Sequence, residues 1–337
     1  MTFNSASRSV IWLAYPGTSP VINLGNEDGA MVVPFIELDG ENQYIDGFEL
    51  KFGCNHFFRV SHQASYRGAH FHNCYFHHMG PGVGGENSGP IMVQRTDDAG
   101  VAHPVYYFVT QDCEFASIDY GTGNCCLKLY DLIRCVLEDL EIHDNTTGSG
   151  NEGMIALKDM CEEFCVRSCT GYNLDGTFIG GNHHMTVTAH PTAGEITYCN
   201  CKDADVAALE INNDGEAGAF VIERCTLQGV VNIRNTDVSD GPFTFRNCVI
   251  VNAQGGNTIP FVTTSGTVDA TRVSMLGDLT PTGTENLMGN AAAAIVDANG
   301  LLIGSYRTSF LGSWGHELLG VQEPGRTRHR GFRLRAA

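Results

Sequence analysis

Apolar and polar residues alternate in short runs along most of the chain, and turn-forming glycine, asparagine or aspartate residues separate many of these runs. Clear examples are PFIELDG, HFFRVS, PIMVQRT, CCLKLYD, MIALKDM, AALEINN, VVNIRNT and TIPFVTT. A period of two is typical of a β-strand with one buried face. The pattern therefore predicts a long series of short strands.

A second kind of phrase recurs between these strands and ends on a cysteine. AHFHNC ends at Cys74, FVTQDC at Cys113, CVRSC at Cys169, TYCNC at Cys201, VIERC at Cys225 and FTFRNC at Cys248. Gly47, Asp139 and Val273 occupy the same slot in three further phrases. Most phrases carry an apolar residue three positions earlier, as at Phe71, Val136, Val166, Ile222 and Phe245.

Most slots follow one another at about 23 to 32 residues, the length of one coil of a parallel β-helix. We therefore expect an all-β fold, a single-stranded parallel β-helix of about 9 to 11 coils, over residues 1–280. Equivalent positions would stack about 4.8 Å apart, so the cysteines would form an internal ladder. The LxxLxL phrase of leucine-rich repeats is absent. Residues 281–337 predict an irregular C-terminal segment with a basic tail.

Alternation assigns each strand residue to one side of the coil. We expect the following side chains inside: Ile36, Phe58, Val60, Ile91, Val93, Leu127, Leu129, Ile155, Leu157, Leu209, Ile211, Val231 and Ile233. We expect the following on the exposed outer face: Arg59, Gln94, Lys128, Lys158, Glu210, Asn212, Asn232 and Arg234.

The charge balance narrows the classes of partner. The chain has 20 Lys+Arg against 38 Asp+Glu, a formal net charge of −18, and only four lysines. Nucleic acid is an unlikely main partner because phosphate binding needs cationic surface. An acidic polysaccharide is disfavoured too, unless cations gather locally. No run of 18 apolar residues predicts a membrane span.

Cysteine usage and the first residues bear on the compartment. Thirteen cysteines is an odd number without paired CxxC spacing, and MTFNSASRSVIWLAYPG shows no signal peptide. We expect buried, reduced thiols in a protein that folds in a cytoplasm. Association with a virion, or secretion of a chain whose leader has been removed, fits the same features.

Lys128 and Lys158 are the leading catalytic candidates. Each precedes a Cys-Val pair by the same interval, so a 30-residue register would place them on adjacent rungs of one face. Neighbouring ammonium groups lower each other's pKa, and a partly neutral lysine can act as a general base. The second lysine or Arg234 could neutralise a uronate carboxylate. This arrangement suits β-elimination on an acidic polysaccharide; the alternative is that the lysines are ordinary surface charges.

The phrases VIWLAYPGTSPVINLG and FIELDGENQYIDGFEL resemble the pectate-lyase-like right-handed β-helix proteins. NEGMIALKDMCEEFCVRSCTGYN is similar to the lysine-bearing strand of family-six polysaccharide lyases, which include alginate lyases and chondroitinase B. The resemblance implies that Lys158 is the base. It also places Asn151 and Gly153 at the positions of two acidic calcium ligands, with Glu152 between them. The family's Arg-His pair is missing, and TFIGGNHH offers His183 or His184 instead.

Other residues extend this candidate site. Asn151, Glu152 and Asp144 could hold Ca²⁺. Substrate-binding candidates on the outer face are Arg59, Gln94, Tyr130, Glu210, Asn212 and Asn232. His70 and His72 alternate on one strand face, with His77 and His78 expected in the following turn; a metal site there competes with simple stacking. The five arginines from 326 to 335 could dock on the acidic body or on a neighbouring subunit.

Two function classes follow from these observations. The first is a lyase that cleaves an acidic, uronate-containing polysaccharide. The second is a non-catalytic glycan-binding or structural β-helix, such as a phage tail or virion protein, which would form a homo-oligomer and usually a trimer. A hydrolase of the polygalacturonase type would need several carboxylates on the strand face, where Glu210 is the main candidate.

Overall fold

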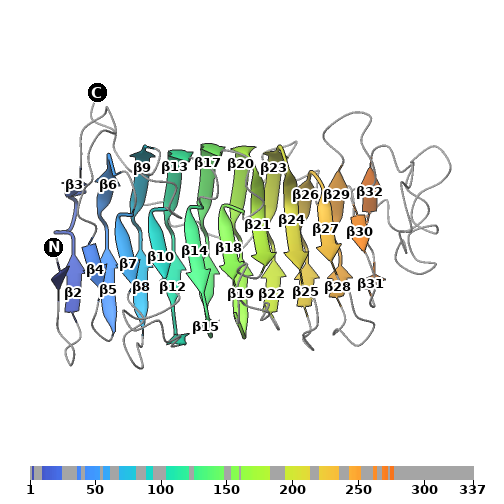
Figure 1. Ribbon diagram of the computed structural model, residues 1–337, viewed down its shortest axis with the longest axis horizontal. Helices are drawn as coiled ribbons and strands as arrows, with labels where there is room; N and C mark the ends of the chain where they lie inside the picture. Colours follow the sequence, from blue (N-terminus) through green and yellow to red (C-terminus); the bar gives the residue numbers. More distant parts are fainter. Residues whose placement is uncertain are drawn as a thin grey trace.

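The computed structural model is an all-β parallel solenoid (Figure 1). It describes residues 2–3, 10–24, 36–38, 42–53, 56–60, 68–80, 89–93, 104–120, 125–147, 153–158, 161–182, 194–212, 220–234, 243–251, 261–263, 268–271 and 274–276. These residues contain no helix, so none of them belongs to a helix long and apolar enough to cross a membrane.

Three ten-stranded sheets run along the axis. Sheet A contains β1 (Thr2–Phe3), β4 (Ile36–Leu38), β7 (Phe58–Val60), β10 (Ile91–Val93), β14 (Leu127–Tyr130), β18 (Ile155–Lys158), β21 (Thr177–Asn182), β24 (Ala207–Asn212), β27 (Val231–Arg234) and β30 (Phe261–Thr263). Sheet B contains β2 (Val10–Leu13), β5 (Gln43–Asp46), β8 (Ala69–His72), β12 (Val109–Gln111), β16 (Val136–Glu138), β19 (Phe164–Arg167), β22 (Gly194–Thr197), β25 (Phe220–Glu223), β28 (Phe243–Arg246) and β31 (Val268–Thr271).

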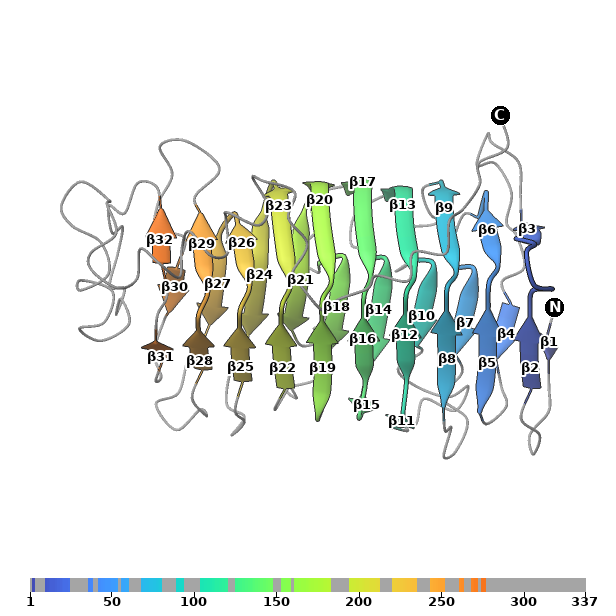
Figure 2. The ribbon, with the colours of Figure 1, turned by 180° about the vertical axis from the view of Figure 1, so that it is seen from behind.

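Sheet C contains β3 (Val21–Asn23), β6 (Glu49–Lys51), β9 (Tyr75–Met79), β13 (Glu114–Tyr120), β17 (Glu141–Thr147), β20 (Thr170–Asp175), β23 (Asn200–Ala204), β26 (Thr226–Gln228), β29 (Val249–Val251) and β32 (Ser274–Leu276). A small sheet pairs β11 (Val105–Tyr106) with β15 (Leu132–Ile133). Each coil supplies one strand to each large sheet, and Figure 2 shows sheets B and C from behind.

The strand pairing confirms the predicted parallel β-solenoid. Each of these sheets contains ten strands in the described part of the chain, which agrees with the expected 9 to 11 coils. The last described strand, β32, ends at Leu276, and the predicted C-terminal segment 281–337 lies outside the described residues.

The interior is apolar, as the alternation predicts. Of the side chains expected inside, all those described are at most 6% exposed; the side chain of Ile233 is not described. Phenylalanines also stack across coils, with the rings of Phe76 and Phe115 parallel at 4.8 Å. This continuous core holds neighbouring coils in register.

The cysteine ladder exists, with a corrected membership. At the corner between sheets B and C the inward slot holds Phe48, Cys74, Cys113, Leu140, Cys169, Cys199, Cys225 and Cys248 in successive coils. Cys201 lies instead in sheet C, Gly47 and Asp139 fall one residue early, and Leu137 rather than Val136 faces inward. The described cysteines are all free thiols, so the ladder is a packing feature.

The residue before each ladder position bends the chain with a left-handed backbone. Gly47, Asn73, Asp112, Asp139, Ser168, Tyr198, Arg224 and Asn247 all have φ between 50° and 82°. Five of these eight are glycine, asparagine or aspartate, the residues that tolerate this conformation best. The Gly/Asn/Asp turns seen in the sequence therefore form one corner of the solenoid.

Two glycines make room for core phenylalanines in the irregular coils. A methyl group on Gly171 would lie 2.4 Å from the Phe178 ring, and one on Gly194 would lie 2.4 Å from the Phe164 ring. Both rings are at most 2% exposed. The inward column of sheet C thus exchanges a side chain at β20 for a ring from β21.

Candidate functional site

The two candidate lysines lie on adjacent strands of the outer side of sheet A, but in a different register from the predicted one. Lys128 pairs with Ala156, and Lys158 pairs with Tyr130. The two lysines are therefore diagonal neighbours, not members of one column. The 30-residue register was wrong because Val136 pairs with Cys165, 29 residues on, while Leu127 pairs with Ile155, 28 residues on.

Both lysines are buried, which corrects the expectation of an exposed face. Lys128 is 0% exposed and Lys158 is 3% exposed, and Tyr130 between them is 2% exposed. The ammonium nitrogens lie 6.0 Å and 5.5 Å from the centre of the Tyr130 ring. Two buried lysines around one tyrosine ring form a compact cationic cluster with cation–π contacts.

Small residues continue the same outer side. Ala156 and Gly180 follow Lys128 on the next two strands, and Glu210 follows Gly180. Glu210 is 7% exposed, so it too is buried rather than on an open face. Near the other end of this row, burial lowers the pKa of His56 to about 4, and the charges of Arg59 and Lys128 lower it further.

The remaining predicted residues of this site are only partly placed. Arg59 is paired with Glu37 at 2.6 Å on the neighbouring strand. Asn212, Asn232 and Arg234 lie in β24 and β27, with their side chains outside the description. Gln94, Asn151 and Glu152 lie outside the described residues, as do His183 and His184. The structure thus brings Lys128, Lys158 and Tyr130 together, with Glu210 two strands further along.

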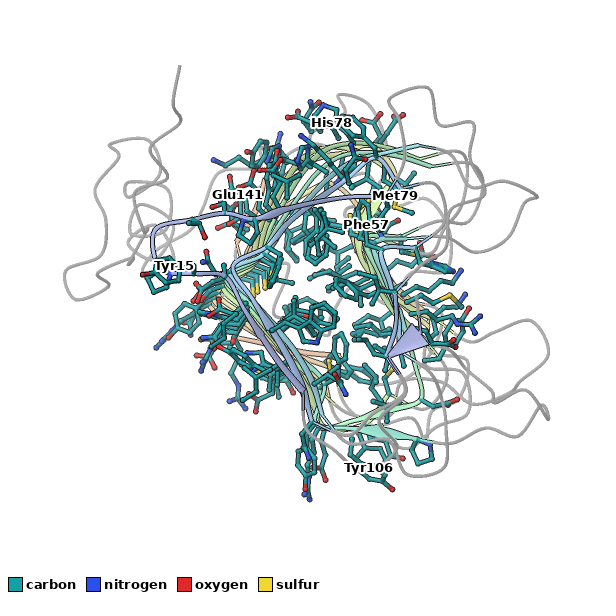
Figure 3. The ribbon with its side chains drawn as sticks, turned by 90° about the vertical axis from the view of Figure 1, so that its left-hand side faces the viewer. Tyr15, Phe57, His78, Met79, Tyr106 and Glu141 are labelled. Carbon is teal, nitrogen blue, oxygen red and sulfur yellow. The ribbon has the colours of Figure 1, made fainter. Side chains whose placement is uncertain are left out.

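A second group of functional side chains occupies the outer face of sheet C. Strands β9, β13, β17 and β20 each contain a residue with a left-handed backbone: His78, Ser117, Asp144 and Asn173, with φ of 50° to 53°. Such a residue interrupts the alternation of a strand and re-aims its side chains, as in a β-bulge. His78 and Glu141 both project outward from this sheet in Figure 3, whereas Met79 and Phe57 point inward.

The outer face of sheet C therefore carries three parallel columns of side chains. The first contains Glu49, Tyr75, Glu114, Glu141, Thr170 and Asn200. The second contains Lys51, His77, Ala116, His143, Tyr172 and Lys202. The third, at the bend, contains His78, Ser117, Asp144 and Asn173. We call these three columns the sheet C face.

His143 is the centre of a hydrogen-bonded network on this face. Its Nε2 lies 3.3 Å from Glu114 Oε1, and its Nδ1 lies 2.9 Å from Asp144 Oδ2. The hydrogen bond to Glu114 is the largest cause of a raised His143 pKa, and Asp144 adds to it. The Tyr172 ring stacks on the imidazole at 4.8 Å with an interplanar angle of 2°.

Neighbouring groups complete the network. The Tyr172 hydroxyl donates to Glu141 Oε1 at 3.0 Å, and the pKa of Tyr172 is raised by burial and by this carboxylate. Asn173 Nδ2 donates to Asp144 Oδ1 at 2.5 Å, and this bond with that of His143 lowers the pKa of Asp144. The carboxylates are thereby held in place as acceptors.

A similar but smaller group lies two strands away. His77 Nε2 lies 3.1 Å from Glu49 Oε1, its Nδ1 faces Nδ1 of His78, and the Tyr75 ring stacks on it at 4.2 Å. Burial lowers the pKa of His77. His77 and His78 thus belong to strand β9, which corrects their expected place in a turn.

The other predicted histidines lie on sheet B. His70 and His72 do alternate on one outer face, as expected, with ring centres 6.1 Å apart. His72 is held between Asp46 at 2.9 Å and Asp112 at 3.3 Å. No group of three or more His, Cys, Asp or Glu side chains within the described ranges is arranged to hold a metal ion. The predicted calcium ligand Asp144 bonds to His143 and Asn173.

Sequence reasoning missed the sheet C face because it assumed strict alternation along each strand. A recurring signal was nevertheless present in CYFHHM, LEIHDN and TGYNLD, where a ring residue is followed by histidine, aspartate or asparagine. Histidine, aspartate and asparagine are the non-glycine residues most tolerant of a left-handed backbone. Aligning these phrases as one column would have predicted the bend.

Comparisons with known proteins add no relative. No protein-family model, no curated protein and no solved structure matches the chain. The functional argument therefore rests on the fold and on the geometry of the two groups of side chains.

Proposed function

We propose that the protein binds an extended polysaccharide along the sheet C face. The observation that carries the proposal is the alignment of carboxylate, imidazole, phenol and amide groups in three columns parallel to the solenoid axis. Equivalent groups recur about every 4.8 Å. A repeating polymer of hydroxyl-rich units fits such a repeating set of acceptors and donors.

The exposure of the face supports binding at the surface. The Glu114 side chain is 28% exposed and Asp144 is 50% exposed, in contrast to the buried lysine cluster of sheet A. Because Tyr172 and His143 stack face to face across strands, their polar edges rather than their ring faces are available to a ligand. Recognition would therefore depend on hydrogen bonds, which are stronger when one partner is charged.

The local charge favours uncharged or amino sugars over uronates. Glu49, Glu114, Glu141 and Asp144 outnumber Lys51, Lys202 and a protonated His143 on this face. Like charges across an interface oppose binding. Neutral sugar hydroxyls can instead donate hydrogen bonds to the carboxylates.

A glycan panel with one matched pair of variants tests this proposal. Glu141→Gln should weaken binding of the recognised glycan about tenfold, since a hydrogen bond to a charged group contributes about 1.5–3 kcal/mol. Glu138→Gln is the control: it lies in the same coil but on sheet B, bonded to Arg167. Equal affinities of both variants, or binding of acidic polymers alone, would reject the sheet C face as the binding surface.

The lysine cluster supports a second candidate function, the β-elimination of a uronate polymer. Lys158 would remove the proton beside the carboxylate, Lys128 would neutralise that carboxylate, and the leaving sugar oxygen would take a proton as its C–O bond breaks and a C=C bond forms. The specific support is the placement of both ammonium groups beside the Tyr130 phenol. Their burial ranks this function second, because a polymer reaches them only if sheet A is uncovered.

Product formation tests the lyase directly. Wild-type protein would be incubated with alginate, pectate and glycosaminoglycans, with and without Ca²⁺, while ultraviolet absorbance of the unsaturated product is followed. Lys158→Ala should abolish turnover, whereas Lys202→Ala on exposed sheet C should leave it unchanged. Absence of product across the panel, or full activity of Lys158→Ala, would remove this candidate.

A further inference from the structure

The first coil exposes large apolar side chains where later coils carry polar ones. Ile11 is 66%, Leu13 60%, Tyr15 79% and Val21 49% exposed. We call these four residues the coil 1 patch. They account for four of the six exposed large hydrophobic residues in the described part of the chain.

Register shows that the patch departs from the pattern of the solenoid. Leu13 pairs with Asp46, and His72, Gln111, Glu138 and Arg167 follow in that column. Val21 pairs with Glu49, which is followed by Tyr75 and Glu114. Outward positions that are polar in the following coils are thus apolar in coil 1, and contiguous exposed apolar patches mark interaction sites.

The patch lies at the end of two sheets. Among the described strands, β2 pairs only with β5, and β3 pairs only with β6. An uncovered sheet edge beside apolar side chains promotes aggregation, and proteins commonly cover such edges with another segment. Tyr15 lies on the outside of this end of the molecule in Figure 3.

One segment of the same chain has the complementary chemistry. Residues 301–322, LLIGSYRTSFLGSWGHELLGVQ, are rich in large apolar residues and include one of the two tryptophans. The following GRTRHRGFRLR carries five arginines. With six arginines and two glutamates, residues 301–337 have a formal charge of +4, against −22 for residues 1–300.

The connecting chain is long enough. Strand β32 ends at Leu276, and nine steps of about 4.8 Å separate the last coil from the first, about 43 Å in all. The 24 residues from 277 to 300 can span about 80 Å when extended. A segment tethered in this way also has a high effective concentration, on the order of millimolar.

We propose that residues 301–335 dock on the coil 1 patch of their own chain, with the apolar part over Ile11, Leu13 and Val21 and the arginines on the acidic body. A second copy is a poorer occupant, since four side chains bury much less than the about 800 Å² per partner of a stable interface. The proposal is independent of the glycan surface, which lies on later coils.

Site-specific photo-crosslinking in the full-length protein tests the docking. A benzoylphenylalanine at position 15 should crosslink to a peptide from residues 301–335, and one at Tyr107, exposed on another coil, should not. Mixing ¹⁴N- and ¹⁵N-labelled chains distinguishes the two sources, because docking within one chain predicts crosslinked peptides of a single isotope. Mixed-isotope products, crosslinks to another part of the chain or to a foreign protein, or no crosslink at position 15 would each overturn the proposal.

Discussion

At the scale of single residues, Thr110 is a polar exception in the apolar interior. It occupies the inward column of sheet B between Phe71 and Leu137 and is 0% exposed. Its hydroxyl has no hydrogen-bond partner in the described part of the structure. A buried hydroxyl without a partner costs free energy that a methyl group of similar size does not.

Thr110→Val should therefore raise the free energy of unfolding by about 1 kcal/mol. Urea-induced unfolding measures this change, and Thr197→Val, on the partly exposed outer side of the same sheet, is the control with an expected change near zero. A loss of stability in Thr110→Val would show that the hydroxyl has a stabilising partner.

Alternation predicted which residues face the core, but it did not predict which outward residues are covered. The predicted inward side chains needed only local information, since successive strand residues point to opposite sides. The burial of Lys128, Lys158 and Glu210 depends on what packs over sheet A, which a strand pattern does not contain. Their diagonal register depended on the length of one corner.

At the scale of strands, Gly171 and Phe178 couple β20 to β21. Gly171→Ala should destabilise the protein by about 1–3 kcal/mol, because its methyl group would lie 2.4 Å from a ring that is 0% exposed. Phe178→Leu in the same chain should recover part of this loss. Thermal unfolding of the two single variants and the double variant measures the coupling; strictly additive losses would contradict the proposed contact.

His143 connects strands β13 and β17 through Glu114 and Asp144, and it predicts a pH dependence. Its folded-state pKa is raised above the unfolded value of about 6.5. The stabilisation is therefore complete below about pH 6 and is lost as pH rises through the raised pKa. The difference in unfolding free energy between wild type and His143→Gln, measured from pH 5 to 9, should shrink with increasing pH. A difference that grows over this range would contradict the network.

The bend in sheet C shows why strand-scale features escape prediction from pattern alone. A single left-handed residue places His143 and Asp144 side by side, where strict alternation would separate them. The cysteine ladder shows the opposite case. Its repeat was recognisable, yet three non-cysteine slots and Cys201 were misplaced by one or two residues because only pairing fixes register.

At the scale of the molecule, the repeat predicted the solenoid correctly because one feature, the coil, determines the whole architecture. Function depends instead on which of three outer faces a ligand can reach. The structure buries the face that the sequence favoured and leaves carboxylates accessible on sheet C. An extended ligand would lie along several coils, so its contacts should be distributed over β9, β13, β17 and β20.

Carboxyl footprinting with and without bound glycan tests this central claim most directly. Carbodiimide-driven labelling, read by mass spectrometry, reports the accessibility of each carboxylate. The account predicts that the bound polysaccharide protects Glu114, Glu141 and Asp144 on sheet C, while Asp112 at the corner and Glu138 on sheet B label as before. Protection of Glu138 with unchanged labelling of Glu114 and Glu141 would contradict it.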